Sequence, residues 1–142
     1  MSVLKYQKEI DENPSDFTGF QERELESFRW VFEDINDARN FLPIYILDEK
    51  RKNDDISNKS YKCIGYALSL FSSKKAAVQR LNEITNNKKF LFKKLGTHIA
   101  CGTLNNSDGI CDEPNESKHF SLFEFVEIDL KSKFAIIEKI VE

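Results

Sequence analysis

Three polar side chains in this sequence lie where predicted β-strands could bring them to a common substrate, and Glu124 is the first of them. It follows Phe120 and Leu122 at intervals of two residues, which places its carboxylate on an apolar strand face. A carboxylate there loses hydration, so its pKa would rise toward the range that a general acid requires. The alternatives are a buried hydrogen-bonding partner, or a bulge that shifts the register and leaves this face partly wet.

Arg29 is the second candidate. It lies between Phe28 and Trp30 in an alternating segment, so its side chain faces away from both aromatic rings. A guanidinium group in this position could pair with Glu124 or clamp an anion. It could equally lie on the solvent side of a half-exposed strand, because antiparallel sheets commonly have one wet face.

Ser69 is the third candidate and belongs to the predicted strand 63–71, which has two unlike faces. The apolar face consists of Ile64, Tyr66, Leu68 and Leu70. The other face carries the small residues Cys63, Gly65, Ala67 and Ser69. Small side chains allow a helix, another backbone or a ligand to approach closely. The sequence therefore leaves open what lies against Ser69.

Ser72 and Ser73 end this strand and begin a helix predicted for residues 73–86. Either hydroxyl can accept a hydrogen bond from a free N–H of the first turn, which is the role of an N-cap. The apolar face of the helix consists of Ala77, Leu81 and Ile84. A helix N-terminus also favours negative charge, so Ser72 is a candidate for binding a cofactor phosphate. No glycine-rich phosphate loop accompanies it.

The order of these candidates resembles that of the mono-ADP-ribosyltransferases. Arg29 lies on an early strand, the segment ALSLFSS leads into an alanine-containing helix, and Glu124 lies on a late strand. The resemblance implies that the arginine holds the phosphates of NAD, the serine segment shapes the nicotinamide pocket, and the glutamate stabilises an oxocarbenium-like transition state. It covers residues 27–141 as element order. The family's Ser-Thr-Ser is here Ser69-Leu70-Phe71-Ser72-Ser73, and its Glu-x-Glu is here Glu124-Phe125-Val126-Glu127.

A separate set of side chains could bind zinc, namely His98, Cys101, Cys111 and His119. Zinc needs four nitrogen or sulfur ligands that converge tetrahedrally, and this set supplies the right atoms. Strand alternation, however, points His98 and Cys101 to opposite faces. Buried thiols and hydrogen-bonded histidines are the alternative, and the default prediction is no metal and no resident cofactor.

Composition restricts the class of protein. The chain has 142 residues, 40% of them hydrophobic, and a formal net charge of −3, which suits one folded domain and disfavours nucleic-acid binding. The three cysteines form no CxxC pair, so a disulfide framework is not expected. The charged N-terminus does not resemble a signal peptide, and no apolar run reaches the roughly 18 residues of a membrane span. These features predict a cytoplasmic protein without a membrane partner.

The predicted architecture is α+β, with a mostly antiparallel sheet and the helix 73–86 packed on it. Residues 1–24, which include ENPSD at 12–16, are expected to form a flexible polar arm, and residues 25–142 a single domain. The charged stretch 48–60 has no apolar period and is expected to be a solvated loop. Strands are predicted at 27–32, 63–71, 119–128 and 133–141, with one or two strands over 90–104 that break near Gly96. Any strand in 41–47 lies at a sheet edge or starts after Pro43.

Two functions are compatible with these observations. The preferred hypothesis is a small binding or regulatory module that acts through a protein partner, because no strong catalytic motif appears and the polar segments could serve recognition. The alternative is an enzyme that uses Arg29, Ser69 and Glu124 on NAD or a related nucleotide. The sequence leaves open whether the chain is an enzyme.

Overall fold

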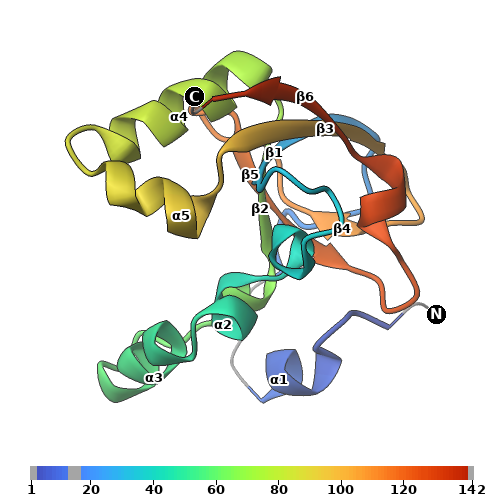
Figure 1. Ribbon diagram of the computed structural model, residues 1–142. Coiled ribbons are helices and arrows are strands. Elements are labelled where there is room, and N and C mark those ends of the chain that lie inside the picture. The colour runs from blue at the N-terminus through green and yellow to red at the C-terminus, as the bar shows by residue number, and fades with distance from the viewer. Residues whose placement is uncertain (1–2, 13–16, 141–142) are drawn as a thin grey trace.

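The computed structural model describes residues 3–12 and 17–140 as one α+β domain built on a six-stranded antiparallel sheet (Figure 1). This confirms the predicted fold class. The strands are β1 (Leu25–Val31), β2 (Leu68–Phe71), β3 (His98–Leu104), β4 (Gly109–Cys111), β5 (His119–Glu124) and β6 (Ala135–Lys139). Their order across the sheet is β4-β5-β2-β1-β3-β6.

The helices form two groups around this sheet. Figure 1 shows α4 and α5 together at the upper left, and α1, α2 and α3 in the lower part of the view. Their bounds are α1 (Gln7–Asp11), α2 (Ile44–Leu47), α3 (Glu49–Ser57), α4 (Lys74–Thr85) and α5 (Phe92–Leu95). Shorter 3-10 turns are found at Ala38–Phe41, Cys63–Tyr66, Lys89–Leu91 and Leu130–Lys133. Among the described residues, no helix has both the length and the apolar character that a bilayer crossing requires.

Both faces of the sheet are buried, each in its own hydrophobic cluster. Val31, Leu70 and Phe120 are fully buried on one face. On the other face, Phe28 and Ile99 pack against α4. This two-sided burial explains why strands in the middle of the sheet carry apolar side chains on both faces.

Helix α4 agrees closely with the sequence prediction. Ser73, rather than Ser72, is the N-cap, and its hydroxyl accepts a hydrogen bond from the Ala76 N–H at 3.3 Å. Ala77 and Leu81 have no exposed surface, as expected for the apolar face of a helix that lies across a sheet.

Residues 41–60 correct two predictions. The run 41–47, predicted as a strand, forms a 3-10 turn and then α2, because Pro43 precedes the first helical residue and its fixed φ suits that position. The stretch 48–60, predicted as a loop, contains α3. The Asp48 carboxylate accepts a hydrogen bond from the Arg51 N–H at 3.0 Å and starts this helix. Because α3 buries no side chain, an apolar period could not reveal it.

Four predicted strands are shorter than expected. Residues 63–66 form a 3-10 turn, and β2 begins only at Leu68. Residues 89–95 are helical, so the predicted strand 90–104 is reduced to β3. Strand β5 ends at Glu124, and β6 covers Ala135–Lys139. Local backbone hydrogen bonds such as that from the Ala67 N–H to the Ile64 carbonyl replace the expected ladder.

The N-terminal segment, predicted as a flexible polar arm, contributes to the core in its described part. Leu4 and Ile10 are buried, and Leu4 forms an isolated β-bridge with Phe125. The bridge is completed by hydrogen bonds from the Lys5 N–H to the Glu124 carbonyl and from the Val126 N–H to the Val3 carbonyl. Two apolar side chains thus anchor an otherwise polar segment. Residues 1–2 and 13–16 of the predicted arm lie outside the described residues.

Candidate functional site

The two central strands separate where the predicted site residues lie. Strand β1 pairs with β3 along its whole length, but its register with β2 consists of the single pair Phe28–Phe71. Next to this pair, Arg29 connects the strands by a side chain, since its Nη1 donates a 2.7 Å hydrogen bond to the Ser69 carbonyl oxygen. The structure thus brings Arg29 and Ser69 together at the point where the sheet opens.

Arg29 is held by backbone carbonyl groups. Its Nε donates to the carbonyl oxygen of Asn40 at 2.6 Å, and its Nη2 lies 3.5 Å from that of Leu42. Burial lowers the pKa of Arg29 to about 10, and the negative charge of Glu124 partly offsets this effect. The group stays protonated at neutral pH. No ion pair joins it to a carboxylate in the described part of the chain, so Glu124 acts on its charge only without contact.

Asn40 positions Arg29 and was not identified from the sequence. Its side chain is buried, and its Oδ1 accepts a hydrogen bond from the Phe32 N–H at 2.7 Å. Its Nδ2 donates to the carbonyl oxygens of Asp34 at 2.8 Å and Ile35 at 3.3 Å. This asparagine therefore closes the loop after β1 and directs its own carbonyl oxygen at the guanidinium group. The only hint of this loop in the sequence was the high proportion of turn-forming residues in EDINDARN.

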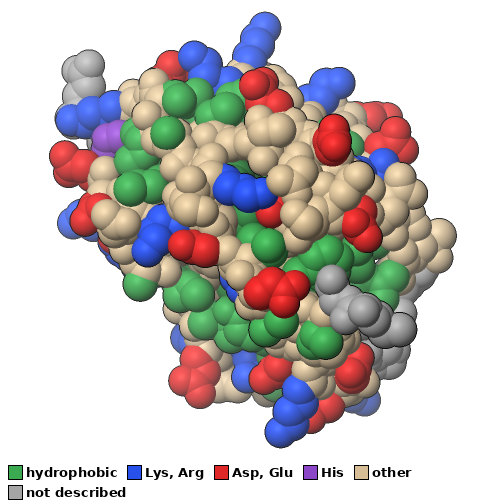
Figure 2. All heavy atoms as spheres, turned by 90° about the vertical axis from the view of Figure 1, so that its right-hand side faces the viewer, with side chains coloured by type: hydrophobic (Ala, Val, Ile, Leu, Met, Phe, Trp, Pro, Cys, Tyr) green, Lys and Arg blue, Asp and Glu red, His purple; other side chains and the backbone are tan. Residues whose placement is uncertain are grey.

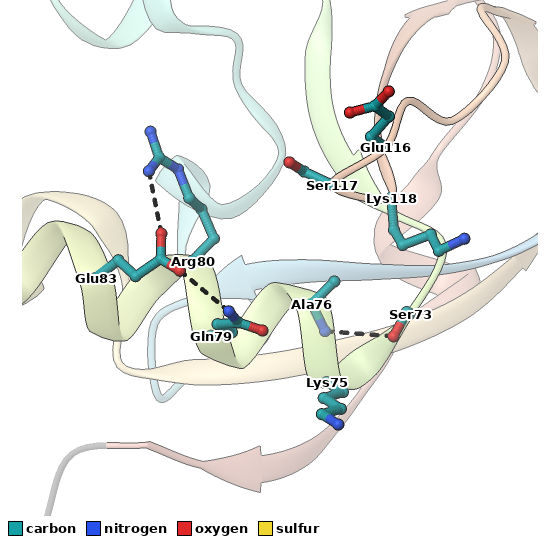
Figure 3. A pocket seen from close by; sticks show the side chains of 9 residues that line it. All are labelled: Ser73, Lys75, Ala76, Gln79, Arg80, Glu83, Glu116, Ser117 and Lys118. Atoms are coloured by element: carbon teal, nitrogen blue, oxygen red, sulfur yellow. Dashed lines mark hydrogen bonds and ion pairs between the residues drawn. The ribbon is translucent and has the colours of Figure 1, made fainter.

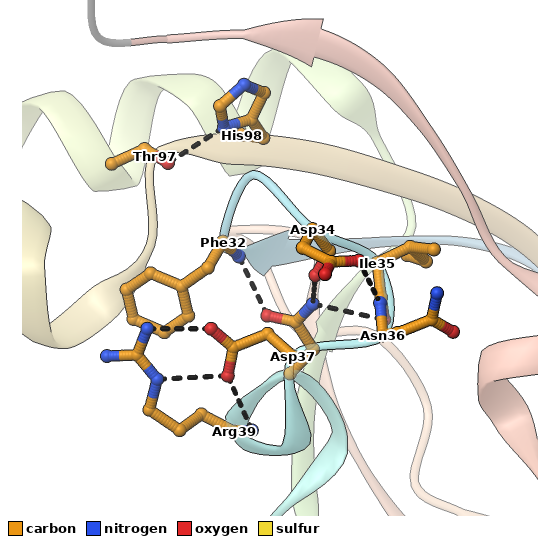
Figure 4. A network of polar contacts seen from close by, with 9 residues as sticks. Phe32, Asp34, Ile35, Asn36, Asp37, Arg39, Thr97 and His98 are labelled. Carbon is orange, nitrogen blue, oxygen red and sulfur yellow. Dashed lines mark hydrogen bonds and ion pairs between the residues drawn. The ribbon is translucent and has the colours of Figure 1, made fainter.

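Neighbouring charges brace the same loop. Figure 4 shows the Arg39 guanidinium paired with the Asp37 carboxylate, with an Nη2–Oδ2 distance of 2.7 Å. The guanidinium carbon also lies 3.7 Å from the centre of the Phe32 ring. Hydrogen bonds from Arg39 lower the pKa of Asp37 to about 2. The Arg39 contacts and the Asn40 side-chain hydrogen bonds thus both hold the loop that presents the Asn40 carbonyl oxygen.

A cleft of about 300 Å³ lies beside Arg29 and Ser69, and we call it the basic cleft. Its aromatic and exposed apolar lining residues are Trp30, Phe71, Ile44, Leu47 and Ile64. Its basic lining residues are Arg29, Arg80 and Lys94, with His119 beside them. None of the described residues that line it carries a carboxylate. Side chains from α2 and the 3-10 turn Cys63–Tyr66 meet there with side chains from α4 and α5.

The small-residue face of segment 63–71 meets two different surroundings. Gly65 lies against the Tyr45 ring, and a Cβ atom at this position would come within 2.2 Å of the Tyr45 Cε2. Ala67 and Ser69 both line the basic cleft, and Ser69 is exposed. An aromatic ring therefore explains the glycine, whereas open space lies against the serine.

Glu124 lies outside the lining of the basic cleft. Its Oε2 is 2.7 Å from the Nζ of Lys5, which also donates to the Ile128 carbonyl oxygen at 2.6 Å. The Glu124 side chain is 4% exposed. Burial raises its pKa, while Lys5 and, without contact, Arg29 act in the opposite direction. Arg29 and Ser69 therefore line the basic cleft, whereas Glu124 does not line it and is paired with Lys5, although its charge still acts on Arg29.

His119 lines the cleft, although the sequence suggested it only as a weak zinc ligand. Its ring meets the Phe71 ring edge-on, with 5.4 Å between centroids. Burial lowers the pKa of His119, Asp112 raises it and Arg80 lowers it, so the imidazole is neutral at physiological pH. Of the other predicted zinc ligands, His98 and Cys101 lie on β3, which β1 and β2 separate from β5, whereas Cys111 lies on β4 next to β5. Within the described residues, no group of three or more His, Cys, Asp or Glu side chains could hold a metal ion.

A second hollow lies between α4 and the loop before β5 (Figure 3). There the charges are mixed, and the Arg80 Nη1 is 3.4 Å from the Glu83 Oε2. Ser73 is occupied as the N-cap of α4. Ser72, predicted as a possible phosphate ligand, instead holds the loop by its N–H, which donates to the Lys118 carbonyl oxygen at 2.8 Å. This hollow lacks the single sign of charge that distinguishes the basic cleft.

The side of the molecule on the right in Figure 1 also differs from the basic cleft. Figure 2 views that side and shows acidic and basic side chains interspersed over it, with hydrophobic side chains between them.

No protein-family model matches the chain, and no curated protein or solved structure is significantly similar to it.

Proposed function

We propose that this chain is a binding or regulatory module that acts through a protein partner, and that the partner docks at the basic cleft. The supporting observation is the exposure of Ile44, Leu47 and Ile64, which is 42%, 40% and 42%, although all three surround one cleft. Large apolar side chains grouped at a concave surface are typical of docking sites, whereas isolated ones are common on any protein. A cleft of about 300 Å³ can receive one or two side chains of a partner.

The cellular setting is part of the same proposal. Cys63, Cys101 and Cys111 are all free thiols, which supports a reducing, cytoplasmic environment. A partner in that environment would meet a cleft whose apolar side chains come from two segments, residues 44–47 and 63–66.

The test compares two isoleucines of the same helix. Ile44 lines the cleft and Ile46 does not, yet their exposures are 42% and 43%. Proteins recovered by affinity capture with the wild-type chain should be lost with Ile44→Ser and retained with Ile46→Ser. Equal recovery by both variants would show that the partner binds elsewhere. Repeated capture of nothing, together with turnover of a small molecule, would contradict a protein-binding role.

A second candidate is an enzyme that handles NAD or a related nucleotide, like the mono-ADP-ribosyltransferases. The observation that favours it is the meeting of Arg29 and Ser69 at a cleft with aromatic walls. The observation against it is that Glu124 is paired with Lys5 and does not line the cleft. Calorimetric titration with NAD should detect binding that Arg29→Lys weakens, and comparison with Glu124→Gln would show whether Glu124 contributes. Absence of NAD binding at millimolar concentration would remove this candidate.

A further inference from the structure

The charge of the basic cleft is opposite in sign to that of the whole chain. The chain carries 24 acidic and 21 basic side chains. The cleft nevertheless gathers Arg29, Arg80 and Lys94, without a carboxylate among its described lining residues. Such a local excess creates a positive potential, which is strengthened by the low dielectric of the apolar wall beside it.

These three cations differ in how free they are to meet a ligand. The N–H groups of Arg29 that face Asn40 and Ser69 already donate hydrogen bonds to their carbonyl oxygens. This residue therefore supplies a positive charge at a fixed position. Lys94 is exposed, and no described carboxylate forms an ion pair with it. Arg80 has an exposed pair with Glu83 at 3.4 Å, and pairs of this kind contribute little and exchange readily. Lys94 and Arg80 are therefore available to an incoming anion.

The exposed apolar and the exposed basic lining residues of the cleft come from different elements. Ile44 and Leu47 belong to α2, whereas Arg80 and Lys94 belong to α4 and α5, and Figure 1 shows these helices in separate groups. A ligand that fills the cleft must therefore present an apolar group toward one set and a negative group toward the other. Ser69 and Ala67 also line the cleft, and their small side chains leave room for the backbone of a ligand to approach closely.

We propose that the occupant is an acidic peptide segment of the partner, with an Asp or Glu carboxylate against Arg80 and Lys94 and a neighbouring apolar side chain against Ile44, Leu47 and Ile64. This inference rests on the proposed protein-binding function and specifies the partner's chemistry. Charge complementarity of this kind steers association and weakens as salt concentration rises.

The experiment selects phage-displayed random peptides on the full-length chain. Selected peptides should carry Asp or Glu within two residues of Leu, Ile, Val or Phe. For a synthetic peptide from that set, Lys94→Glu should weaken binding by about tenfold, as expected for loss of a close charge pair. Lys93→Glu is the matched control, because Lys93 is also an exposed lysine of α5 but does not line the cleft. It should change affinity by less than about twofold.

Each outcome separates this inference from the proposed function. Peptides whose binding is lost with Ile44→Ser but unchanged by Lys94→Glu and Arg80→Glu would overturn the acidic specificity and leave the docking site intact. Peptides indifferent to Ile44→Ser would overturn both. Recovery of binding when the acidic residue of the peptide is changed to Lys and paired with Lys94→Glu would establish the contact directly. Competition by NAD alone, without selection of acidic peptides, would overturn the inference in favour of a nucleotide.

Discussion

Arg29 on β1 and Glu124 on β5 are two charged side chains with little or partial exposure, yet their surroundings differ. Glu124 is covered by the N-terminal segment and paired with Lys5 at 2.7 Å. Arg29 is held by neutral carbonyl oxygens and lies beside an open cleft. An ion pair thus compensates the charge of Glu124, whereas Arg29 has no ion-pair partner among the described residues.

The comparison shows that different partners hold the two charges, a lysine for Glu124 and backbone carbonyl groups for Arg29. A buried carboxylate is costly unless it is paired, and the Lys5 ammonium group and the β-bridge at Leu4 meet that need together. Carbonyl groups satisfy the hydrogen bonds of a guanidinium group without cancelling its charge. Variants that alter either surrounding would test this contrast.

The largest effect is expected from Arg29→Met. Loss of the short bonds to the Asn40 and Ser69 carbonyl oxygens should lower the free energy of unfolding by about 3 kcal/mol, because bonds to a charged group are strong. Denaturant titration measures this change. Arg80→Met, in the same cleft but exposed, should change stability by less than about 0.5 kcal/mol. Equal effects would mean that Arg29 is no more structural than Arg80.

Lys5→Met should lower the free energy of unfolding by about 2 kcal/mol near pH 7, since it leaves the Glu124 carboxylate buried without its partner. Burial already raises the pKa of Glu124 and Lys5 lowers it, so this variant should raise the pKa further. A carboxyl group with a raised folded pKa stabilises the fold below its unfolded pKa, and this contribution is lost as pH rises through the folded pKa.

The cost of Lys5→Met should therefore shrink toward about pH 3, where Glu124 is protonated in both the folded and the unfolded state. Unfolding measured across this range gives the pH profile, and carboxyl NMR of Glu124 gives its pKa. Lys8→Met is the control, because Lys8 is exposed on α1. A loss that is the same at both ends of the range would contradict the pairing.

Gly65→Ala tests the closed part of the small-residue face. The added Cβ would overlap the Tyr45 ring, so the ring must move, at a cost of about 1 to 2 kcal/mol by thermal or denaturant unfolding. Ser69→Ala, on the same face but open to the cleft, should stay within about 0.5 kcal/mol. If Gly65→Ala were equally neutral, the ring contact would not explain the glycine.

The smallest effect is expected at the start of α4, which carries Arg80 into the cleft. Ser73→Ala removes the N-cap hydroxyl and should cost about 1 kcal/mol of unfolding free energy. Ser72→Ala should cost less, because the hydroxyl of Ser72 makes a long 3.4 Å contact with the Lys118 carbonyl oxygen. The reverse order would assign the cap to Ser72.

Several elements could be predicted because their information is local. Strand β1 follows from alternating aromatic residues, and α4 from a serine cap and the spacing of Ala77, Leu81 and Ile84. Helix α3 could not be predicted by period, because its residues face water and caps rather than burial sustain it. The anchoring of Leu4 and Ile10 was missed because two apolar residues in a polar segment give no period.

The sequence by itself determined the α+β class, the antiparallel sheet, α4 with its serine cap and the polar residues worth testing. Tertiary structure decided which of those residues meet. Arg29 and Ser69 are 40 residues apart, and the separation of β1 from β2 joins them at one cleft. Glu124 is 119 residues from the lysine that pairs with it. Such pairings depend on which segment covers which strand end, and that depends on packing across the whole chain rather than on any local pattern.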